Sequence, residues 1–495
     1  MHDIERHRNP IAKRSVCSLI AFLLVGWTVS PTVFVSAEDT ATEWKAGVAT
    51  VTITPEQPMW MAGYAARNKP SEGKVHDLHA KALALEDAQG TRLVIVTMDL
   101  LGVTRDMRDS VEVEAKRLYG LPPEGLLMNA SHTHCGPELR ADAAEISGVS
   151  PEHVERIKEY VPVLQEKIVR IIGESLANLA PAELAYSHGR AGFAMNRRQP
   201  TEHGVENRPY PDGPVDHDVP MLRVDKPGGE LRAVLFGYAC HNTTLDFYQF
   251  CGDYAGFAQQ YVEESHPGVT ALFMIGCGGD QNPQPRGIPD PARFRRLQNP
   301  SDAVPYRIPR GAVELAEQHG RALANGVEAA LHSYPRMVHA PLRAAMDTVA
   351  LDFAKTPTKE DLEKQAQSPG KYERDHARML LEELEKTGKI RISYPYLAQT
   401  IRFGDDLTLV ALSGEATVDY SLRLKKELAG APVWVAGYCN DVFGYLASRR
   451  VLEEGGYEAV GSTGFYGLPG GFALSVEEAV VGKVKDEIRR MKDEG

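Results

Sequence analysis

The sequence Asn-Ala-Ser-His-Thr-His-Cys-Gly-Pro occupies residues 129–137, at the end of a strand–helix–strand pattern. The apolar run 93–98 predicts a buried strand, residues 103–119 predict a crossover helix, and residues 125–128 predict a second buried strand. Such a unit is typical of an α/β sheet, in which ligands bind beyond the carboxyl ends of the strands. We therefore expect the His-Thr-His of this stretch to lie at a functional edge of the sheet.

His132 and His134 are separated by one residue, and in an extended chain this spacing places both imidazoles on one side. Two adjacent imidazoles can share a metal ion, or one can bind it while the other handles a proton or the substrate. The alternative is that both are polar side chains with ordinary hydrogen-bond partners at a strand end.

Several other apolar runs also end in a polar or charged side chain. His241, Asp280 and Glu415 each follow such a run, as Asp99 and His132 do. When several strands end in this way, one rim of the sheet is expected to form a site. Two histidines and a glutamate are suitable ligands for zinc and leave one position for water or substrate, which is a hydrolytic arrangement.

Strands and helices alternate along the 495 residues, which predicts an α/β fold with mixed sheets flanked by helices. The charged segment 355–395 predicts a helical insertion, either a hairpin or a lid. The net charge of −12 and the lack of a basic run argue against a nucleic-acid partner.

Residues 1–37 have the pattern of a cleavable signal peptide. A basic beginning is followed by the apolar stretch 18–29, which is too short to span a membrane, and by Val-Ser-Ala at 35–37. We expect an exported protein, secreted or periplasmic, whose mature chain is 38–495 and has no transmembrane segment.

Five cysteines follow the signal peptide: Cys135, Cys240, Cys251, Cys277 and Cys439. They lack CxxC spacing, which argues against a structural zinc knuckle. We expect small buried side chains rather than nucleophiles, with a disulfide between neighbouring motif loops as the alternative. An odd number leaves at least one free thiol.

The order of the motifs resembles that of the neutral/alkaline (non-lysosomal) ceramidases. The resemblance extends over about 45–470 and rests on residues 47–54, 61–64, 131–137, 196–197, 216–218, 241–244, 252–256, 279–280, 414–417 and 440–445. It implies a single large catalytic domain of neutral ceramidase type over 38–495. The C-terminal β-sandwich domain usual in the family is expected to be lacking, and the insertion at 355–395 has no identified counterpart.

The resemblance implies a zinc (Zn2+) site formed by His132, His241, Glu415 and Tyr445. It also implies that His134 helps to bind the scissile amide and that Arg197 contacts the substrate or an oxyanion. Taken singly, each residue also has a structural interpretation, such as a buried aromatic ring for Tyr445.

One departure from the family concerns its serine nucleophile, which lies in a Gly-Asp-Val-Ser-Pro-Asn segment. Residues 279–284 read Gly-Asp-Gln-Asn-Pro-Gln, so Asn282 stands at the position of that serine. Water activated by the metal is then the expected nucleophile. His134 or Asp280 could carry the proton, and Asn282 could donate its amide to an oxyanion. Cys135 is a weaker candidate nucleophile.

We therefore expect an exported zinc amidohydrolase that cleaves an N-acyl bond of ceramide or of a related polar substrate. The expected lips of the site, 202–214 and 283–310, are polar, which favours a polar substrate such as a glycan over a lipid. Two alternatives are a metal-dependent hydrolase or lyase acting on a non-amide bond of an extracellular glycan, and an inactive binding protein on the same scaffold. The partner is accordingly a small molecule, a lipid or a glycan.

Overall fold

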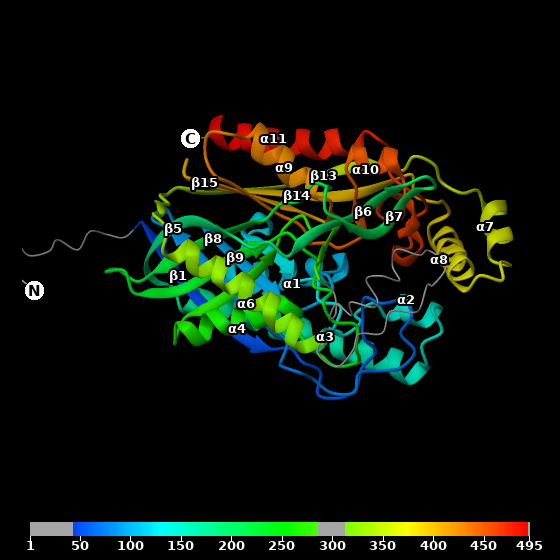
Figure 1. Cartoon of the computed structure of the whole chain (residues 1–495), viewed down its shortest axis with the longest axis horizontal. Coiled ribbons are helices and arrows are strands. Elements are labelled where there is room, and N and C mark those ends of the chain that lie inside the picture. The colour runs from blue at the N-terminus through cyan, green and yellow to red at the C-terminus, as the bar shows by residue number, and fades with distance from the viewer. Residues whose placement is uncertain (1–42, 286–311, 494–495) are drawn as a thin grey trace, which may run out of the picture. The chain divides into compact units, whose positions relative to one another are not determined.

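The apolar runs of the sequence form the strands of a nine-stranded mixed sheet in the computed structural model, which describes residues 43–285 and 312–493 (Figure 1). The strand order is β10-β9-β8-β5-β1-β2-β3-β4, with β12 paired to β5. The strands are β1 (Trp44–Thr52), β2 (His79–Asp87), β3 (Arg92–Met98), β4 (Leu126–Ala130), β5 (Ala180–Arg190), β8 (Asp218–Asp225), β9 (Leu231–Tyr238), β10 (Thr270–Ile275) and β12 (Arg336–Met337). The predicted signal peptide and most of the predicted lip at 283–310 lie outside the described residues.

Both faces of the sheet are covered at its centre, which explains why strands such as β3, β4 and β10 are mostly apolar along their length. Along β3, Val94 and Val96 face a cluster with the helices, whereas Leu93 and Ile95 face a cluster with a second sheet. The helices on the first face are α1 (Arg105–Tyr119), α3 (Pro151–Ala177), α4 (Asp253–Ser265) and α6 (Ala312–Leu331).

The second sheet has the order β13-β14-β15-β17 and packs against the other face of the first. Its strands are β13 (Leu342–Asp352), β14 (Ser393–Phe403), β15 (Leu407–Leu412) and β17 (Val433–Ala436). Helices α9 (Val418–Glu427) and α11 (Val476–Asp493) cover its outer face (Figure 1). The result is four layers, helix–sheet–sheet–helix, and the predicted α/β class with mixed sheets flanked by helices is confirmed.

The predicted crossover helix is α1. Thr104 caps its start, since Thr104 Oγ1 accepts a hydrogen bond from the Met107 amide at 3.2 Å. Gly120 ends the helix with a φ of +66°, a left-handed conformation that glycine adopts at low cost. The crossover joins the parallel strands β3 and β4 and so fixes where the His-Thr-His stretch emerges.

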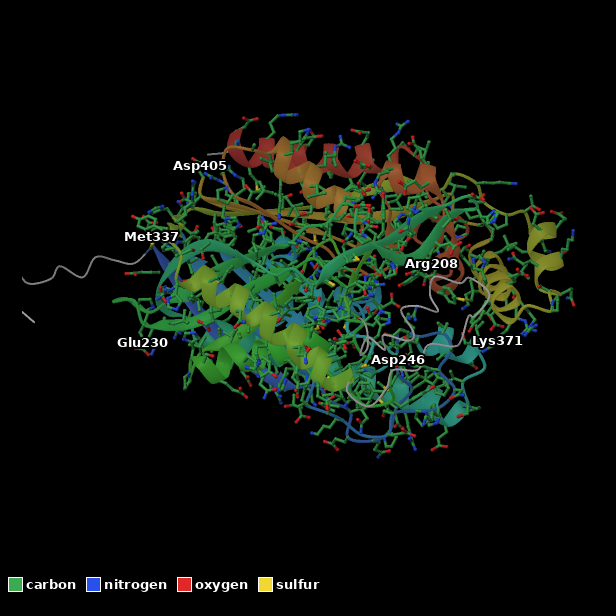
Figure 2. All side chains as sticks on the ribbon, viewed as in Figure 1. Arg208, Glu230, Asp246, Met337, Lys371 and Asp405 are labelled. Carbon is green, nitrogen blue, oxygen red and sulfur yellow. The ribbon has the colours of Figure 1, made fainter. Side chains whose placement is uncertain are left out.

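The charged segment 355–395 forms two helices between β13 and β14, namely α7 (Lys359–Gln365) and α8 (Lys371–Thr387). Figure 2 shows Lys371 at the start of α8 and Arg208 on β7 (Gly204–Tyr210). Strand β7 pairs with β6 (Ala194–Thr201), which also pairs with β11 (Gln281–Pro283). The predicted lip 202–214 is therefore partly a β-hairpin. Among the described residues, no helix is long and apolar enough to span a membrane.

The two edge strands of the nine-stranded sheet, β4 and β10, are tied together by the side chain of Asn129. Asn129 Nδ2 donates to the Gly437 carbonyl at 2.8 Å, and Asn129 Oδ1 accepts from the Ile275 amide at 3.1 Å. The segment 436–440 lies between the two edges, because Asn129 bridges to Cys439 and Gly276 bridges to Ala436. This contact sets the distance between the strand ends that form the site.

Replacing Asn129 with alanine is expected to lower the free energy of unfolding by roughly 2–5 kcal/mol, because two buried backbone groups lose their partners. Chemical denaturation monitored by circular dichroism measures the change. Asn325→Ala, on the exposed side of α6, is the matched control and should stay near wild type. Equal stability of both variants would contradict the role assigned to Asn129.

Glu487 of α11 is buried against β14, where Thr400 Oγ1 donates to Glu487 Oε2 at 2.6 Å. Burial raises the pKa of Glu487 from its ordinary value of 4.5 to about 8. The folded state then holds this proton more tightly than the unfolded state, so stability is fully present below pH 4.5 and falls as pH rises towards 8.

The variant Glu487→Gln should escape this loss. We expect its free energy of unfolding to exceed that of wild type increasingly between pH 5 and 8, by an amount on the order of a few kcal/mol at the upper end, and its melting temperature to be higher accordingly. Thermal melts across this range, with exposed Glu385→Gln of α8 as control, test the expectation. A difference that does not change with pH would exclude the proposed cause.

Candidate active site

The His-Thr-His stretch does not continue β4 as an extended strand. His132 has a φ of +62°, a left-handed conformation that is strained for a residue with a side chain. The chain therefore turns directly after the strand, which differs from the extended spacing expected from the sequence. The two imidazoles still meet, with His134 Nε2 lying 3.2 Å from His132 Nε2.

Two short backbone pairings bring distant motifs to this turn. Thr133 forms a parallel bridge with Asn242, which places His241 beside the His-Thr-His stretch. Strands β16 (Glu415–Ala416) and β18 (Tyr445–Leu446) pair in parallel, with Glu415 opposite Tyr445. The first pairing joins residues 109 positions apart along the chain, and the second joins residues 30 positions apart.

Three buried side chains converge on one point. Glu415 Oε2 lies 3.2 Å from His132 Nε2 and 3.1 Å from His241 Nε2, and each of the three side chains is only 1% exposed. The third histidine, His134, also offers a nitrogen, and the three histidine nitrogens lie within 4.8 Å of one another.

The hydrogen bonds on the far sides of the rings set the tautomers. His132 Nδ1 lies 2.6 Å from the Leu101 carbonyl oxygen, and His241 Nδ1 lies 2.7 Å from that of Gly278. A carbonyl only accepts, so each Nδ1 carries the proton and the neutral ring presents a lone pair at Nε2. Backbone carbonyls commonly orient metal-binding histidines in this way.

With both rings neutral, Glu415 Oε2 has no hydrogen-bond donor. Three electron pairs then face one another in a buried space, and a cation between them turns this repulsion into attraction. Burial, reinforced by the charge of Arg197, lowers the pKa of His241 to about 4, so its nitrogen is available at neutral pH. The residues present therefore fit a divalent metal ion.

Tyr445 and Arg197 lie beside this cluster. Tyr445 Oη is 3.5 Å from His241 Nε2 and accepts a hydrogen bond from Arg197 Nη2 at 2.9 Å. Arg197 is fixed in turn by Glu458, whose Oε1 accepts from Arg197 Nε at 2.8 Å. The structure thus brings together His132, His134, His241, Glu415, Tyr445 and Arg197.

Asn282 lies at the same pocket wall. Its Oδ1 accepts hydrogen bonds from Arg197 Nη1 at 3.3 Å and from Thr243 Oγ1 at 3.4 Å. Both neighbours are donors, so the Asn282 carboxamide is oriented with Oδ1 towards them. Its Nδ2 is then available to donate a hydrogen bond elsewhere.

Asp280 lies apart from this cluster. Its Oδ1 accepts from the Val418 amide at 2.9 Å, and its Oδ2 accepts from Asn196 Nδ2 at 3.0 Å. It is fully buried and is not among the residues that line the pocket. These contacts connect β11, β6 and α9, whereas a role in proton transfer stays a prediction.

All five cysteines are buried. Burial raises the pKa of the Cys135 thiol far above its ordinary value, so Cys135 has little thiolate for nucleophilic attack. No disulfide links any of them, which agrees with the expected small buried side chains.

Two residues of the site lie outside the sequence motifs. Tyr466, at the end of a short helix (Thr463–Tyr466), donates from its Oη to Glu415 Oε1. Glu458 holds both Arg197 and Arg198 from a single π-helical turn (Tyr457–Gly461). The sequence offers one indirect signal for Glu458. The arginines of the Asn-Arg-Arg sequence need an acidic partner once they are buried.

A pocket of about 380 Å³ opens onto this cluster. His134, His241, Tyr445, Arg197 and Asn282 line its inner end, and aromatic side chains form much of its wall: Trp60, Tyr64, Tyr372, Tyr457, Phe465 and Tyr466. From the predicted lip 202–214, only Asn207 lines it. Aromatic and charged side chains from other segments therefore form most of the described wall.

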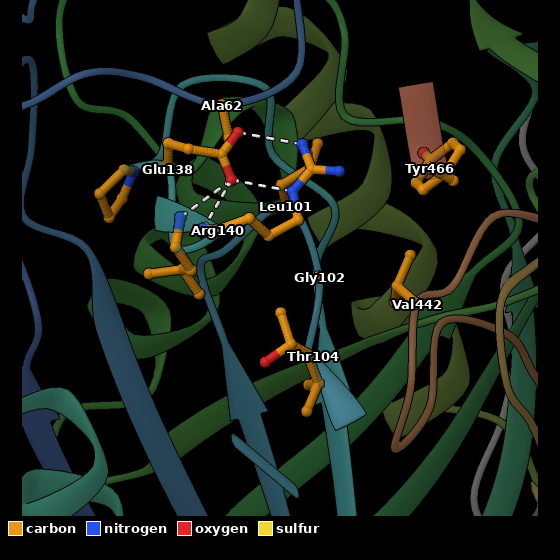
Figure 3. Close-up of a pocket in the computed structure, with 11 residues that line it drawn as sticks. Ala62, Leu101, Gly102, Thr104, Glu138, Arg140, Val442 and Tyr466 are labelled. Carbon is orange, nitrogen blue, oxygen red and sulfur yellow. Dashed lines mark hydrogen bonds and ion pairs between the residues drawn. The ribbon is translucent and has the colours of Figure 1, made fainter. Parts of the chain in front are cut away.

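A second, much smaller cavity of about 30 Å³ lies next to this pocket (Figure 3). Leu101, Glu138, Arg140 and Tyr466 line both spaces. Figure 3 shows Glu138 and Arg140 paired, with Arg140 Nε 2.9 Å from Glu138 Oε1. This volume is sufficient for a water molecule beside the metal-binding cluster.

Known proteins resemble this chain in sequence. Two curated relatives are Neutral ceramidase A of Dictyostelium discoideum, 24% identical over 246 residues, and Neutral ceramidase of Mycobacterium tuberculosis, 25% identical over 252 residues. Each match covers 46% of this chain, but only 34% and 38% of the respective relative. The matched part thus spans little more than a third of the length of these relatives.

Solved structures match over more of the chain. The crystal structure of neutral ceramidase from Pseudomonas aeruginosa has a TM-score of 0.67 at 20% identity and covers 90% of this chain and 75% of that one. A structure described as ceramidase complexed with C2 has a TM-score of 0.68 at 19% identity, with coverage of 92% and 76%. At such identities the likeness shows the fold.

The family model described as neutral/alkaline non-lysosomal ceramidase, N-terminal, matches residues 44–283. This range contains the His-Thr-His stretch, Arg197, His241 and Asn282. The resemblance seen in the ordered motifs is confirmed: residues 44–283 match the N-terminal part of the neutral/alkaline non-lysosomal ceramidases, and the chain has the fold of solved neutral ceramidases.

Proposed function

We propose that this protein is a zinc-dependent hydrolase that cleaves the N-acyl bond of ceramide or of a related polar amide. His132, His241, Glu415 and Tyr445 are the proposed ligands. The observation that supports the proposal is the convergence of two imidazole nitrogens and a carboxylate oxygen within 3.2 Å, with no proton to share. Export through a signal peptide at 1–37, with 38–495 as the catalytic domain, is part of the same proposal.

The bound metal would polarise the amide carbonyl and activate a water molecule. Arg197 holds the Tyr445 hydroxyl in place, and Glu458 prevents the guanidinium from turning away. His134 lies in the pocket wall beside His132, where its imidazole can pass a proton from water to the leaving amine.

Asn282 supplies the oxyanion contact in this proposal. Arg197 and Thr243 fix its carboxamide from one side, so Nδ2 is presented as a donor without further reorganisation. A fixed donor of this kind stabilises negative charge that develops on the carbonyl oxygen. The side chain that replaces the family serine thereby keeps a role in the reaction although it cannot act as a nucleophile.

Metal content of the purified protein tests the proposed site. Wild type is expected to hold about one zinc ion per chain, whereas His241→Ala and Glu415→Gln should each lose it, because the three remaining ligands bind much more weakly. Elemental analysis by mass spectrometry provides the measurement, and exposed His188→Ala on β5 is the control.

Hydrolysis of N-acylsphingosines is measured on the same preparations. It should disappear with chelator and return with zinc. Wild type that binds no zinc, or zinc that persists in both ligand variants, would refute the ligand set. Zinc binding without hydrolysis of any amide would refute the reaction alone.

Asn282→Ala is expected to lower kcat by roughly 100- to 1,000-fold, the usual effect of losing one oxyanion donor. KM and zinc content should change little, since Asn282 is not a proposed ligand. Steady-state kinetics, with Asn325→Ala as the control for the same substitution, separate the two parameters. Full activity in Asn282→Ala would show that another group stabilises the oxyanion.

A further inference from the structure

The pocket extends from the metal-binding cluster to helix α8. Tyr372, Asp375 and Met379 line it from this helix. Their spacing of three and four residues places all three on one face of α8. The helix belongs to the segment between β13 and β14 that has no identified counterpart in the family.

Asp375 is a buried carboxylate without a partner. Its side chain belongs to a residue that is only 7% exposed, and its Oδ2 has no hydrogen-bond donor among the residues that the structure describes. Burying an unpaired charge is unfavourable by several kcal/mol. The buried carboxylate of Asp375 therefore destabilises the fold, and we infer that it has a function in binding.

The other charged side chains that line the pocket have partners in the protein. Arg67 donates hydrogen bonds to the backbone carbonyls of Ala62 and His134. Arg197 lies 2.8 Å from Glu458, and Arg140 lies 2.9 Å from Glu138. Asp375 differs from them because its Oδ2 has no donor among the described residues and can accept a hydrogen bond from a molecule in the pocket.

Aromatic rings connect the two ends of the pocket. Tyr445 contacts Tyr457 with ring centroids 5.6 Å apart, Tyr457 contacts Phe465 at 6.4 Å, and Phe465 contacts Tyr372 at 5.4 Å. Such a wall packs against carbon–hydrogen surfaces of a substrate. A molecule that fits must combine an amide at the metal end, an apolar surface along the wall and hydrogen-bond donors near Asp375.

We propose that Asp375 determines substrate specificity by accepting hydrogen bonds from hydroxyl groups of the amide substrate. This inference rests on the proposed function and deepens it, since it names the substrate class as hydroxylated amides. A hydroxylated lipid amide and an N-acyl amino sugar share this chemistry. A simple alkyl amide lacks it and would leave the carboxylate buried and unpaired.

The test compares three probes on zinc-loaded full-length protein: N-acetylsphingosine, N-acetylglucosamine and hydroxyl-free N-acetyldodecylamine. Values of kcat/KM are measured for probes that are hydrolysed and Kd values, by calorimetry, for those that are not. Wild type should favour at least one hydroxylated probe over the alkyl amide. The hydroxylated probe that is preferred identifies the source of the hydroxyl groups as lipid or sugar.

Asp375→Asn should reduce this preference by roughly 10- to 100-fold, as expected for hydrogen bonds to a charged group. The alkyl amide should be unaffected, and Glu385→Gln, which removes an exposed charge from the same helix, should behave as wild type. Asp375→Ser is the second variant, and thermal melts establish that each variant is folded.

An unchanged preference in folded Asp375 variants would overturn the inference while leaving the hydrolase proposal intact. Failure of wild type to bind or hydrolyse either hydroxylated probe would overturn it as well. Binding of a hydroxylated probe that depends on Asp375 but is never followed by hydrolysis would support the specificity role and refute the proposed reaction.

Discussion

The site depends on one electrostatic constraint, namely that Glu415 Oε2 lies within 3.2 Å of two imidazole nitrogens that face it with lone pairs. Carbonyl oxygens of Leu101 and Gly278 hold the protons on the other side of the rings. A protonated imidazole could donate a hydrogen bond to Glu415 in place of a bound cation. Burial opposes this, because it keeps the pKa of His241 near 4. The surrounding fold is organised to maintain this arrangement, which is unfavourable on its own.

Backbone contacts away from the metal-binding cluster hold its residues in this unfavourable arrangement. His132 is held in a left-handed conformation by the bridge from Thr133 to Asn242, and Glu415 is positioned by its pairing with Tyr445. Both pairings need the two sheets to keep their relative position. Asn129 provides this through hydrogen bonds to β10 and to Gly437. The stability of the edge-to-edge contact and the geometry of the metal-binding cluster are therefore coupled.

Sequence patterns could predict the fold class because strands such as β3, β4 and β10 are mostly apolar along their length and the crossover helix α1 has clear start and end signals. They could also indicate the cluster, since His241 and Glu415 follow strands whose carboxyl ends meet. The left-handed turn at His132 was not foreseeable, because it depends on a partner about 110 residues later in the chain. Tyr466 and Glu458 were not predicted as site residues for a similar reason. Short irregular helices bring them to the site, and no periodic sequence pattern marks such turns.

The character of the pocket shows why surface composition is a poor guide to substrate. The segment 202–214 is polar, yet most of it pairs as a β-hairpin and only Asn207 reaches the pocket. Aromatic rings from segments far apart in the sequence form the wall instead. An aromatic wall alone would favour a purely apolar substrate. The unpaired carboxylate of Asp375 opposes this, because desolvating it without a donor costs more than one additional apolar contact returns. A substrate with both an apolar surface and hydroxyl groups is the one that satisfies both ends of the pocket.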